Sequence, residues 1–268
     1  MKNRLTLILA FALLTLFTSL HIGCEKVDLK SLQGLSNSDI VAGLREALDT
    51  AALSSSKTGS AVNGFLKNEL IRLALPKELQ PVLTVMQNVK RVPLLGNGLY
   101  SSISTKVDDF TTSLNRAAEA ASGKAFPVFK TAITDMSISD GLGILQGGDT
   151  AATHYLREKT TAGLMKAFQP ECTKMIEQVE VTKYYKDLAE VYNRAMPLVK
   201  PFLTSRATVA DLPDKLEVDL PTYVTDRTIH GMFILMRGEE KKIRDNPLGY
   251  ASDIIKKVFG SDEAKQKK

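Results

Sequence analysis

The amino-acid sequence predicts an all-α protein, a single multi-helix bundle-like domain that follows a cleaved signal peptide. Three observations lead to this prediction. Apolar residues repeat with the helical period of about 3.6, alternating strand patterns are almost missing, and glycine, proline and capping residues divide the chain into helix-sized stretches. Neither a domain-sized linker nor an internal repeat interrupts the 268 residues, so we expect one domain over residues 35–260.

The first residues are basic and then apolar. An uncharged run over residues 5–20 is followed closely by Gly23-Cys24. The run is shorter than the roughly 20 apolar residues that span a bilayer core. This layout predicts a lipoprotein signal peptide over residues 1–23 and lipid attachment at Cys24. Ordinary signal cleavage and an uncleaved anchor are the alternatives, because His21 stands where a lipobox usually has leucine.

The residue after the cysteine bears on the compartment. In bacteria that sort lipoproteins by the second mature residue, aspartate favours the inner membrane, so Glu25 favours the outer membrane. We expect a lipid-anchored protein of the cell envelope that faces the periplasm and meets the membrane through its acyl chains. Residues 24–34 are predicted to form a short tether and residues 261–268 a charged, disordered tail.

Composition excludes a nucleic-acid partner. The formal net charge is only +5, two of the basic residues belong to the leader, and tryptophan is absent. Once Cys24 is acylated, Cys172 is the only thiol left, so an internal disulfide is not expected. Cys172 falls on a stripe of apolar residues at helical spacing, which predicts a buried small side chain.

The helices are predicted in order from their start and stop signals. Ser36 begins the first with a capping box to Asp39, and a Ser/Gly-rich stretch over residues 54–64 ends it. Pro76 begins the second, which ends before Pro93. The third covers residues 99–121, with an apolar residue at every third or fourth place. Further helices are predicted at 124–136, 139–146, 149–174, 182–195, 219–244 and 247–259.

Prolines and one apolar segment refine this outline. Pro170 is expected to kink or divide its helix, and Asn246-Pro247 to separate the last two. The segment 229–236 is apolar nearly all round, which places its helix at the centre of the bundle. His230 lies within that segment and is therefore predicted to be a hydrogen-bonded core histidine.

Polar residues interrupt the alanine-rich part of the third helix. Arg116 and Glu119 are spaced i,i+3 and predict a salt bridge beside Asn115. A structural network is favoured over a catalytic dyad because the motif has no matched base and nucleophile. If the pair is buried it needs partners, and the candidates from other motifs are Asp149, Arg157 and Glu240.

A second polar motif is Gly147-Gly148-Asp149-Thr150. It predicts a tight corner between helices, with Asp149 accepting amide hydrogens at the start of the next helix. An anion bound at that helix N-terminus is the alternative. His154, beside Tyr155 and Arg157, is a candidate to face a cleft. The possible polar network or ligand site thus comprises Asn115, Arg116, Glu119, Asp149, Thr150, His154 and Arg157.

Several ordered motifs together resemble one bacterial family. They are Leu35-Ser36-Asn37-Ser38-Asp39, residues 113–121 (SLNRAAEAA), residues 147–153 (GGDTAAT) and residues 239–244 (EEKKIR). The sequence is similar in these motifs to domain-of-unknown-function family 4197, from about Leu35 to Gly260. That family has no assigned activity, so the resemblance implies a helical exported protein and no catalytic residues.

The sequence leaves three classes of function. Metal-ligand spacings, P-loop, nucleophile-elbow and dinucleotide motifs are missing, so we predict no metal, no cofactor and no enzyme. The favoured function is a non-enzymatic scaffold or interaction protein of the cell envelope. A carrier that holds a lipid or another hydrophobic ligand between helices is the alternative. An unrecognised enzyme using Arg116, Glu119, Asp149 or His154 is the third.

Overall fold

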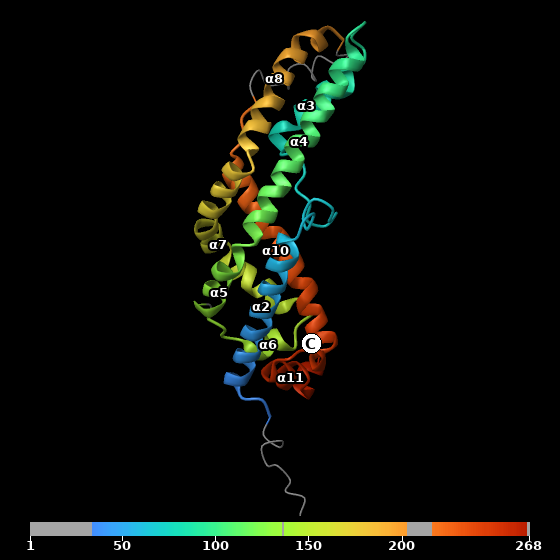
Figure 1. The fold of residues 1–268 in the computed structure, drawn as a ribbon. Coiled ribbons are helices and arrows are strands. Elements are labelled where there is room, and N and C mark those ends of the chain that lie inside the picture. The colour runs from blue at the N-terminus through green and yellow to red at the C-terminus, as the bar shows by residue number, and fades with distance from the viewer. Residues whose placement is uncertain (1–33, 136, 203–215, 267–268) are drawn as a thin grey trace, which may run out of the picture. The chain divides into compact units, whose positions relative to one another are not determined.

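Helix α10 (Leu220–Asp245) lies at the centre of the bundle, in contact with α2 (Asn37–Ser60), α4 (Gly96–Ser122) and α7 (Ala151–Gln178) (Figure 1). Met232 and Met236 are fully buried in its apolar segment, as the sequence predicts. The computed structural model describes residues 34–135, 137–202 and 216–266. Within Ser36–Lys268, which forms one compact unit with its own core, every described regular element is helical.

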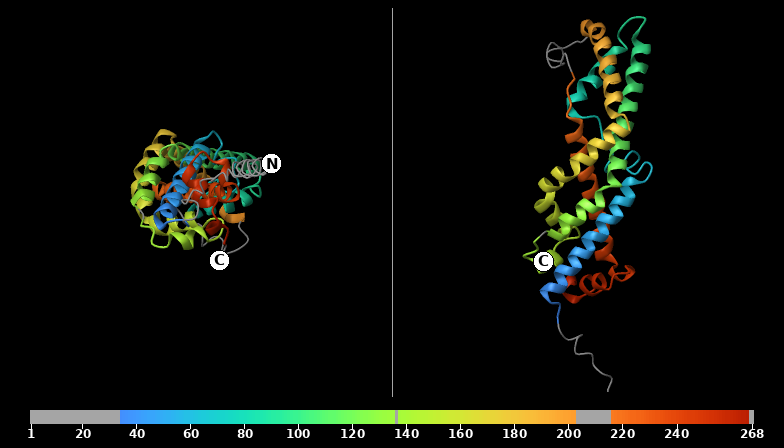
Figure 2. Two further views of the ribbon diagram at one scale, coloured as in Figure 1. Left: turned by 90° about the horizontal axis from the view of Figure 1, so that it is seen from below. Right: turned by 60° about the vertical axis from the view of Figure 1, so that its left-hand side comes forward.

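The remaining helices surround α10 or extend α4. Helix α4 runs beside α8, and α2 beside α5 and α11. At one end of this unit lie α3, the start of α4 and the end of α8, and at the other lie α6 and α11 (Figure 2). The elements not yet bounded are η2 (Lys77–Leu79), α3 (Gln80–Val89), α5 (Ala125–Asp135), α6 (Gly141–Leu145), α8 (Val181–Val199), η3 (Lys200–Phe202), η4 (Pro247–Gly249), α11 (Asp253–Phe259) and α12 (Asp262–Lys265).

Helix α2 begins as predicted and ends later than predicted. The hydroxyl of Ser36 accepts the amide of Asp39 at 3.1 Å and closes the capping box. The helix then continues through the Ser/Gly-rich stretch to Ser60. Ser56 and Gly59 are buried there, and the Ser56 hydroxyl donates to the carbonyl of Ser122 at 2.6 Å. The small residues that predicted a break instead allow α2 to approach α4 closely.

Other helix ends also differ from the prediction. Pro170 does not divide α7, which continues to Gln178; the proline lies on the exposed face of the helix, where water can satisfy the carbonyl that it leaves without a donor. The chain from Pro247 to Phe259 forms η4 and α11 rather than one helix, because the side chain of Ser252 starts α11 by accepting the amide of Ile255. Asn246 separates α10 from η4, as predicted.

Two further predictions are wrong, the burial of one histidine and the disorder of the C-terminal tail. His230 is exposed although it lies in the most apolar part of α10, since the helix turns that position away from its neighbours. In the segment expected to be a disordered tail, Asp262–Lys265 forms α12, capped by the hydroxyl of Ser261.

Several predictions fall outside the described residues. The signal peptide, the lipid-attachment site Cys24 and the tether up to residue 33 are among them. In the ranges that the structure describes, no helix combines the length and the apolar character needed to cross a membrane.

Candidate functional site

The polar residues of α4 hold the irregular segment between α2 and η2, residues 61–76, which we call the connector. Asn115 is fully buried, and its side chain bonds both backbone groups of Leu73, accepting from the amide and donating to the carbonyl at 2.9 Å each. Its amide also donates to the carbonyl of Thr111 at 2.8 Å. Asn115 thereby pairs with the connector as a neighbouring strand would, in a region that has no strand of its own.

Glu119 and Arg116 hold the other half of the connector. The Glu119 carboxylate is buried and accepts the amides of Phe65 and Leu66 at 3.2 and 3.1 Å. Arg116 donates to the second carboxylate oxygen, so the predicted i,i+3 salt bridge is present. It also donates to the side chain of Asn63 at 3.0 Å, and Asn63 has a left-handed backbone with φ of 65°.

One aromatic side chain locks the connector into the core. Phe65 is fully buried and lies against two glycines, Gly59 of α2 and Gly231 of α10. A Cβ atom at Gly231 would come within 2.7 Å of the Phe65 ring. The ring therefore depends on glycine at that place, and the polar bonds of Glu119 fix the backbone on either side of it.

A second buried carboxylate organises the corner between α6 and α7. Glu240 of α10 is almost fully buried, and its oxygens accept the amides of Ala152 and Thr153 at 3.0 and 2.7 Å. Arg244, one turn further along α10, pairs with Glu240 and donates to the carbonyls of Leu145 and Ile144. One ion pair thus caps the start of α7 and the end of α6.

The predicted corner between α6 and α7 is present at residues 147–150, and an anion does lie at the start of α7. The anion at the start of α7 is the chain's own Glu240, from a helix almost 90 residues later in the sequence. Thr150 occupies the cap position without a side-chain bond, and Asp149 forms a surface ion pair with Lys241 at 3.1 Å. Asp149 and Glu240 are therefore engaged at this corner, and neither serves as the partner of Arg116.

The candidate residues thus divide into two groups. Asn115, Arg116 and Glu119 meet at the connector, whereas Asp149, Thr150, His154 and Arg157 belong to the first turns of α7 or the corner before it. His154 is exposed, with Nδ1 3.7 Å from the carboxylate of Glu158, and Arg157 is partly exposed. In the part of the chain that the structure describes, no three His, Cys, Asp or Glu side chains are grouped to hold a metal ion.

Cys172 is buried in α7, as predicted. Desolvation raises the pKa of its thiol to about 11 and outweighs a hydrogen bond with Thr225 that lowers it. The thiol is thus un-ionised at neutral pH and a poor nucleophile.

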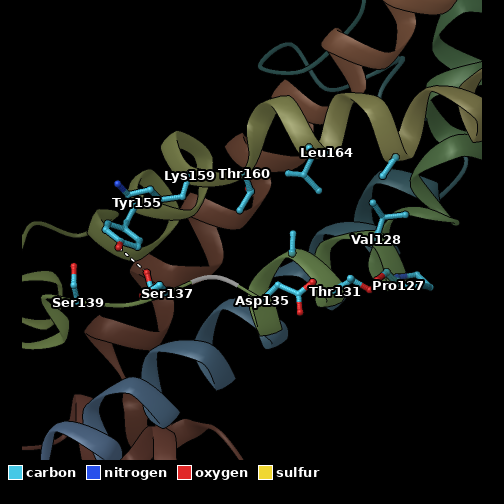
Figure 3. A pocket seen from close by; sticks show the side chains of 13 residues that line it. Pro127, Val128, Thr131, Asp135, Ser137, Ser139, Tyr155, Lys159, Thr160 and Leu164 are labelled. Atoms are coloured by element: carbon cyan, nitrogen blue, oxygen red, sulfur yellow. Dashed lines mark hydrogen bonds between the residues drawn. The ribbon is translucent and has the colours of Figure 1, made fainter.

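The concave surface that stands out is a groove between α5 and α7 of about 900 Å³ (Figure 3). On the α7 side, Gly163 and Ala167 have side chains too small to fill the groove. A Cβ atom at Gly163 would meet no other atom within 4 Å. Leu164 is buried, and Val128 and Ala132 form the facing wall on α5. The lining is mainly apolar, and the groove is partly open to solvent.

Polar groups gather at one end of this groove, which we call the α5–α7 groove. Tyr155, Lys159, Ser137 and Ser139 lie there, and the Tyr155 hydroxyl donates to the carbonyl of Ser137 at 2.7 Å. The Lys159 ammonium lies 5.5 Å from the centre of the Tyr155 ring and has no ion pair among the described residues. The groove therefore combines an apolar floor with two charged residues of opposite sign in its lining, Lys159 of α7 and Asp135 at the end of α5.

The family-model comparison covers almost all of the described domain. Residues 34–260 match the family described as "Protein of unknown function (DUF4197)". The chain belongs to this family. The resemblance seen in the sequence motifs is thereby confirmed. The function of the DUF4197 family is unknown, so membership assigns no activity to the α5–α7 groove. No curated protein and no solved structure matches the chain.

Within this DUF4197 domain, sequence reasoning identified the α4 residues and missed the groove. The groove residues carry no unusual spacing, since Gly163 and Ala167 look like ordinary small positions on a long helix. Its one signal is that α7 has exposed small and apolar positions where a solvated face is usually charged. The role of Glu240 had a clearer signal, because Glu240 and Arg244 are spaced i,i+4.

Proposed function

We propose that this DUF4197 protein is a non-enzymatic interaction protein of the cell envelope, which binds an apolar segment of a partner protein in the α5–α7 groove. The proposal rests on the groove, a mainly apolar cavity with a volume of about 900 Å³ between two helices. Small-molecule sites enclose most of their ligand, whereas this groove is partly open to solvent. Open apolar grooves between helices suit a partner helix that lays its apolar face into them.

The polar residues support a non-enzymatic function. The side chains of Asn115 and Glu119 already bond backbone groups of the connector, and Arg116 bonds Glu119. His154 lies on a different helix from these residues and is absent from the lining of the pocket beside Arg116. A hydrolytic or transfer reaction needs a nucleophile, a base and a stabilising donor around one point, and these side chains do not supply that set.

We further propose that the protein is anchored by acyl chains on Cys24 and faces the periplasm, with the outer membrane favoured by Glu25. The test is metabolic labelling with palmitate in the native host. The wild-type chain should take up label and the Cys24→Ala chain should not, and globomycin should leave an unprocessed, longer chain. Processing that is unaffected by globomycin, together with no label, would contradict the anchor.

The partner-binding proposal is tested by photo-crosslinking in cells. A photoreactive residue at position 132 faces the groove and should give one discrete protein adduct. Ala167→Trp fills the groove and should abolish the adduct. Ala162→Trp is the matched control, since Ala162 is an exposed alanine of the same helix that does not line the groove, and it should leave the adduct unchanged. Equal adducts in all three chains would reject the proposal.

A bound hydrophobic ligand is the second candidate. The volume of the groove lies within the roughly 300–1,000 Å³ of ligand sites, and Lys159 is placed to meet an acidic group. Native mass spectrometry of protein purified from its own envelope separates the two candidates. A retained lipid that Ala167→Trp removes would support this second candidate and contradict the first.

A further inference from the structure

A second cavity lies beside the connector, with Asp109 and Arg116 of α4 in its lining, and we call it the α4 pocket. Its volume of about 610 Å³ falls within the roughly 300–1,000 Å³ of small-molecule sites. Helix α4 supplies most of the lining, Val62 comes from the connector, and Val179 and Tyr184 come from the junction of α7 and α8. The α4 pocket and the α5–α7 groove share no described lining residue.

Arg116 reaches this pocket with unused hydrogen-bond donors. Its guanidinium uses two of its five N–H donors, for Glu119 and for the side chain of Asn63, and the other three have no partner among the described residues. These two bonds hold the guanidinium in place, while 36% of the Arg116 side chain remains exposed. Because the group is already held, it loses little conformational entropy when it binds an acceptor such as a carboxylate.

An unpaired carboxylate lies on the same face of α4, seven residues earlier. Asp109 is partly buried, and it forms no hydrogen bond or ion pair within the described ranges. Lys106 attracts it from three residues away, but the Lys106 ammonium forms its ion pair with Asp187, at 3.1 Å. Seven residues rise by about 10 Å along a helix, so Asp109 and Arg116 face the pocket two turns apart.

The charges in the lining determine which kind of ligand fits. Among the described lining residues, Asp109 and Glu119 are acidic and Arg116 is basic, so the net charge is negative. This excess disfavours a simple anion, because a suitable ligand needs a cationic group for Asp109 as well as an acceptor for Arg116. Between the two, the Thr112 hydroxyl has no described partner and is available to a polar ligand. Val62, 81% exposed, offers an apolar contact at the rim.

We propose that the α4 pocket binds a short peptide with free termini, with the ammonium group at Asp109 and the carboxylate at Arg116. An extended chain of three residues spans about 10 Å, which matches the rise between the two charged residues along α4. Small apolar side chains on the peptide contact Val62 and Val179. This inference concerns binding without a reaction, and it does not rest on the α5–α7 groove.

A ligand with one charge is a weaker match to the same pocket. It would leave either the Asp109 carboxylate or the free donors of Arg116 without a partner in a partly enclosed space, where an unpaired polar group is costly. A purely apolar ligand would leave both without a partner.

Isothermal titration calorimetry tests the proposal with the full chain purified in mild detergent and with trialanine as the probe. Trialanine should bind, and N-acetyltrialanine and trialanine amide should each bind about tenfold more weakly, because each lacks one charged terminus. Asp109→Asn should weaken trialanine binding by about tenfold and leave the binding of N-acetyltrialanine unchanged. Asp108→Asn is the matched control, since Asp108 is an exposed neighbour that does not line the pocket, and it should bind as the wild type does.

A second variant separates ligand binding from the folding of the connector. Arg116→Gln should bind trialanine and trialanine amide equally, whereas a purely structural defect would weaken both peptides and keep the preference between them. Three results would overturn the proposal: no binding of trialanine below about 10 mM, equal binding of the three peptides by the wild type, or an unchanged preference for the free termini in both variants. Inorganic phosphate that binds at Arg116 as tightly as trialanine would also overturn it, by showing a simple anion site.

Discussion

The two buried glutamate–arginine pairs use the same chemistry in different surroundings. Glu240 and Arg244 are enclosed, with only 10% of the arginine side chain exposed, and they join α10 to the ends of α6 and α7. Glu119 is also buried, but it lines a pocket of about 610 Å³ at which 36% of the Arg116 side chain is exposed, and the pair holds only the connector. The α10 pair should therefore determine global stability, and the α4 pair should determine local order in the connector.

The largest effect is expected from Glu240→Ala. Removing one partner of an enclosed pair leaves Arg244 uncompensated and two buried amides without an acceptor, so the free energy of unfolding should fall by about 3–5 kcal/mol. Chemical denaturation measures the loss. Glu177→Ala, an exposed glutamate on α7, should change stability by less than about 0.5 kcal/mol. If the free energy of unfolding falls no further in Glu240→Ala than in this control, the pair does not hold the corner between α6 and α7.

Glu119→Ala should destabilise less. It removes the acceptor of the Phe65 and Leu66 amides, but both lie in a segment close to the surface that water can reach after local opening, so we expect about 2 kcal/mol. Denaturation measured in parallel with Glu240→Ala checks the order of the two. If Glu119→Ala is the more damaging, the division between global and local roles is wrong.

The two arginines differ in exposure, and their removal should differ in cost. Arg116→Ala should lower stability by about 1 kcal/mol or less, because the Arg116 side chain is 36% exposed and water can reach the Glu119 oxygen that it leaves. Arg244→Ala should cost several times as much, because Glu240 would keep a buried charge without its partner. Melting temperatures of the two variants provide the check, and equal shifts would contradict the difference in enclosure.

The smallest effect at neutral pH concerns Cys172, which reports on the packing of α7. Burial raises the pKa of its thiol to about 11 in the folded protein, whereas the same thiol in the unfolded chain has a pKa of about 8.5. Between these two pH values only the unfolded chain loses the proton. The contribution of the buried thiol to the free energy of unfolding is therefore fully present below about pH 8.5 and is lost as pH rises from there through about 11. Denaturation curves should fall more steeply with pH in the wild type than in Cys172→Ala. Identical slopes would show that the thiol is not buried in solution.

Much of the fold could be predicted from the sequence, because local signals decide it. The capping box at Ser36 and the apolar segment of α10 each identify a helix from neighbouring residues alone. The exposure of His230 and the continuation of α2 depend instead on which faces pack, which periodicity does not specify. The backbone amides that Glu119 and Glu240 bind lie more than 50 residues away in sequence, so the motifs indicated the two ion pairs without indicating which amides they hold.

Amide hydrogen exchange, resolved by peptide in Glu119→Ala and Glu240→Ala, tests the division of roles most directly. The α4 variant should lose protection in residues 61–76 and keep it at the start of α7, whereas the α10 variant should lose protection at residues 151–156 and across the core helices. Loss of protection throughout the unit in the α4 variant, or only at the corner in the α10 variant, would contradict the account.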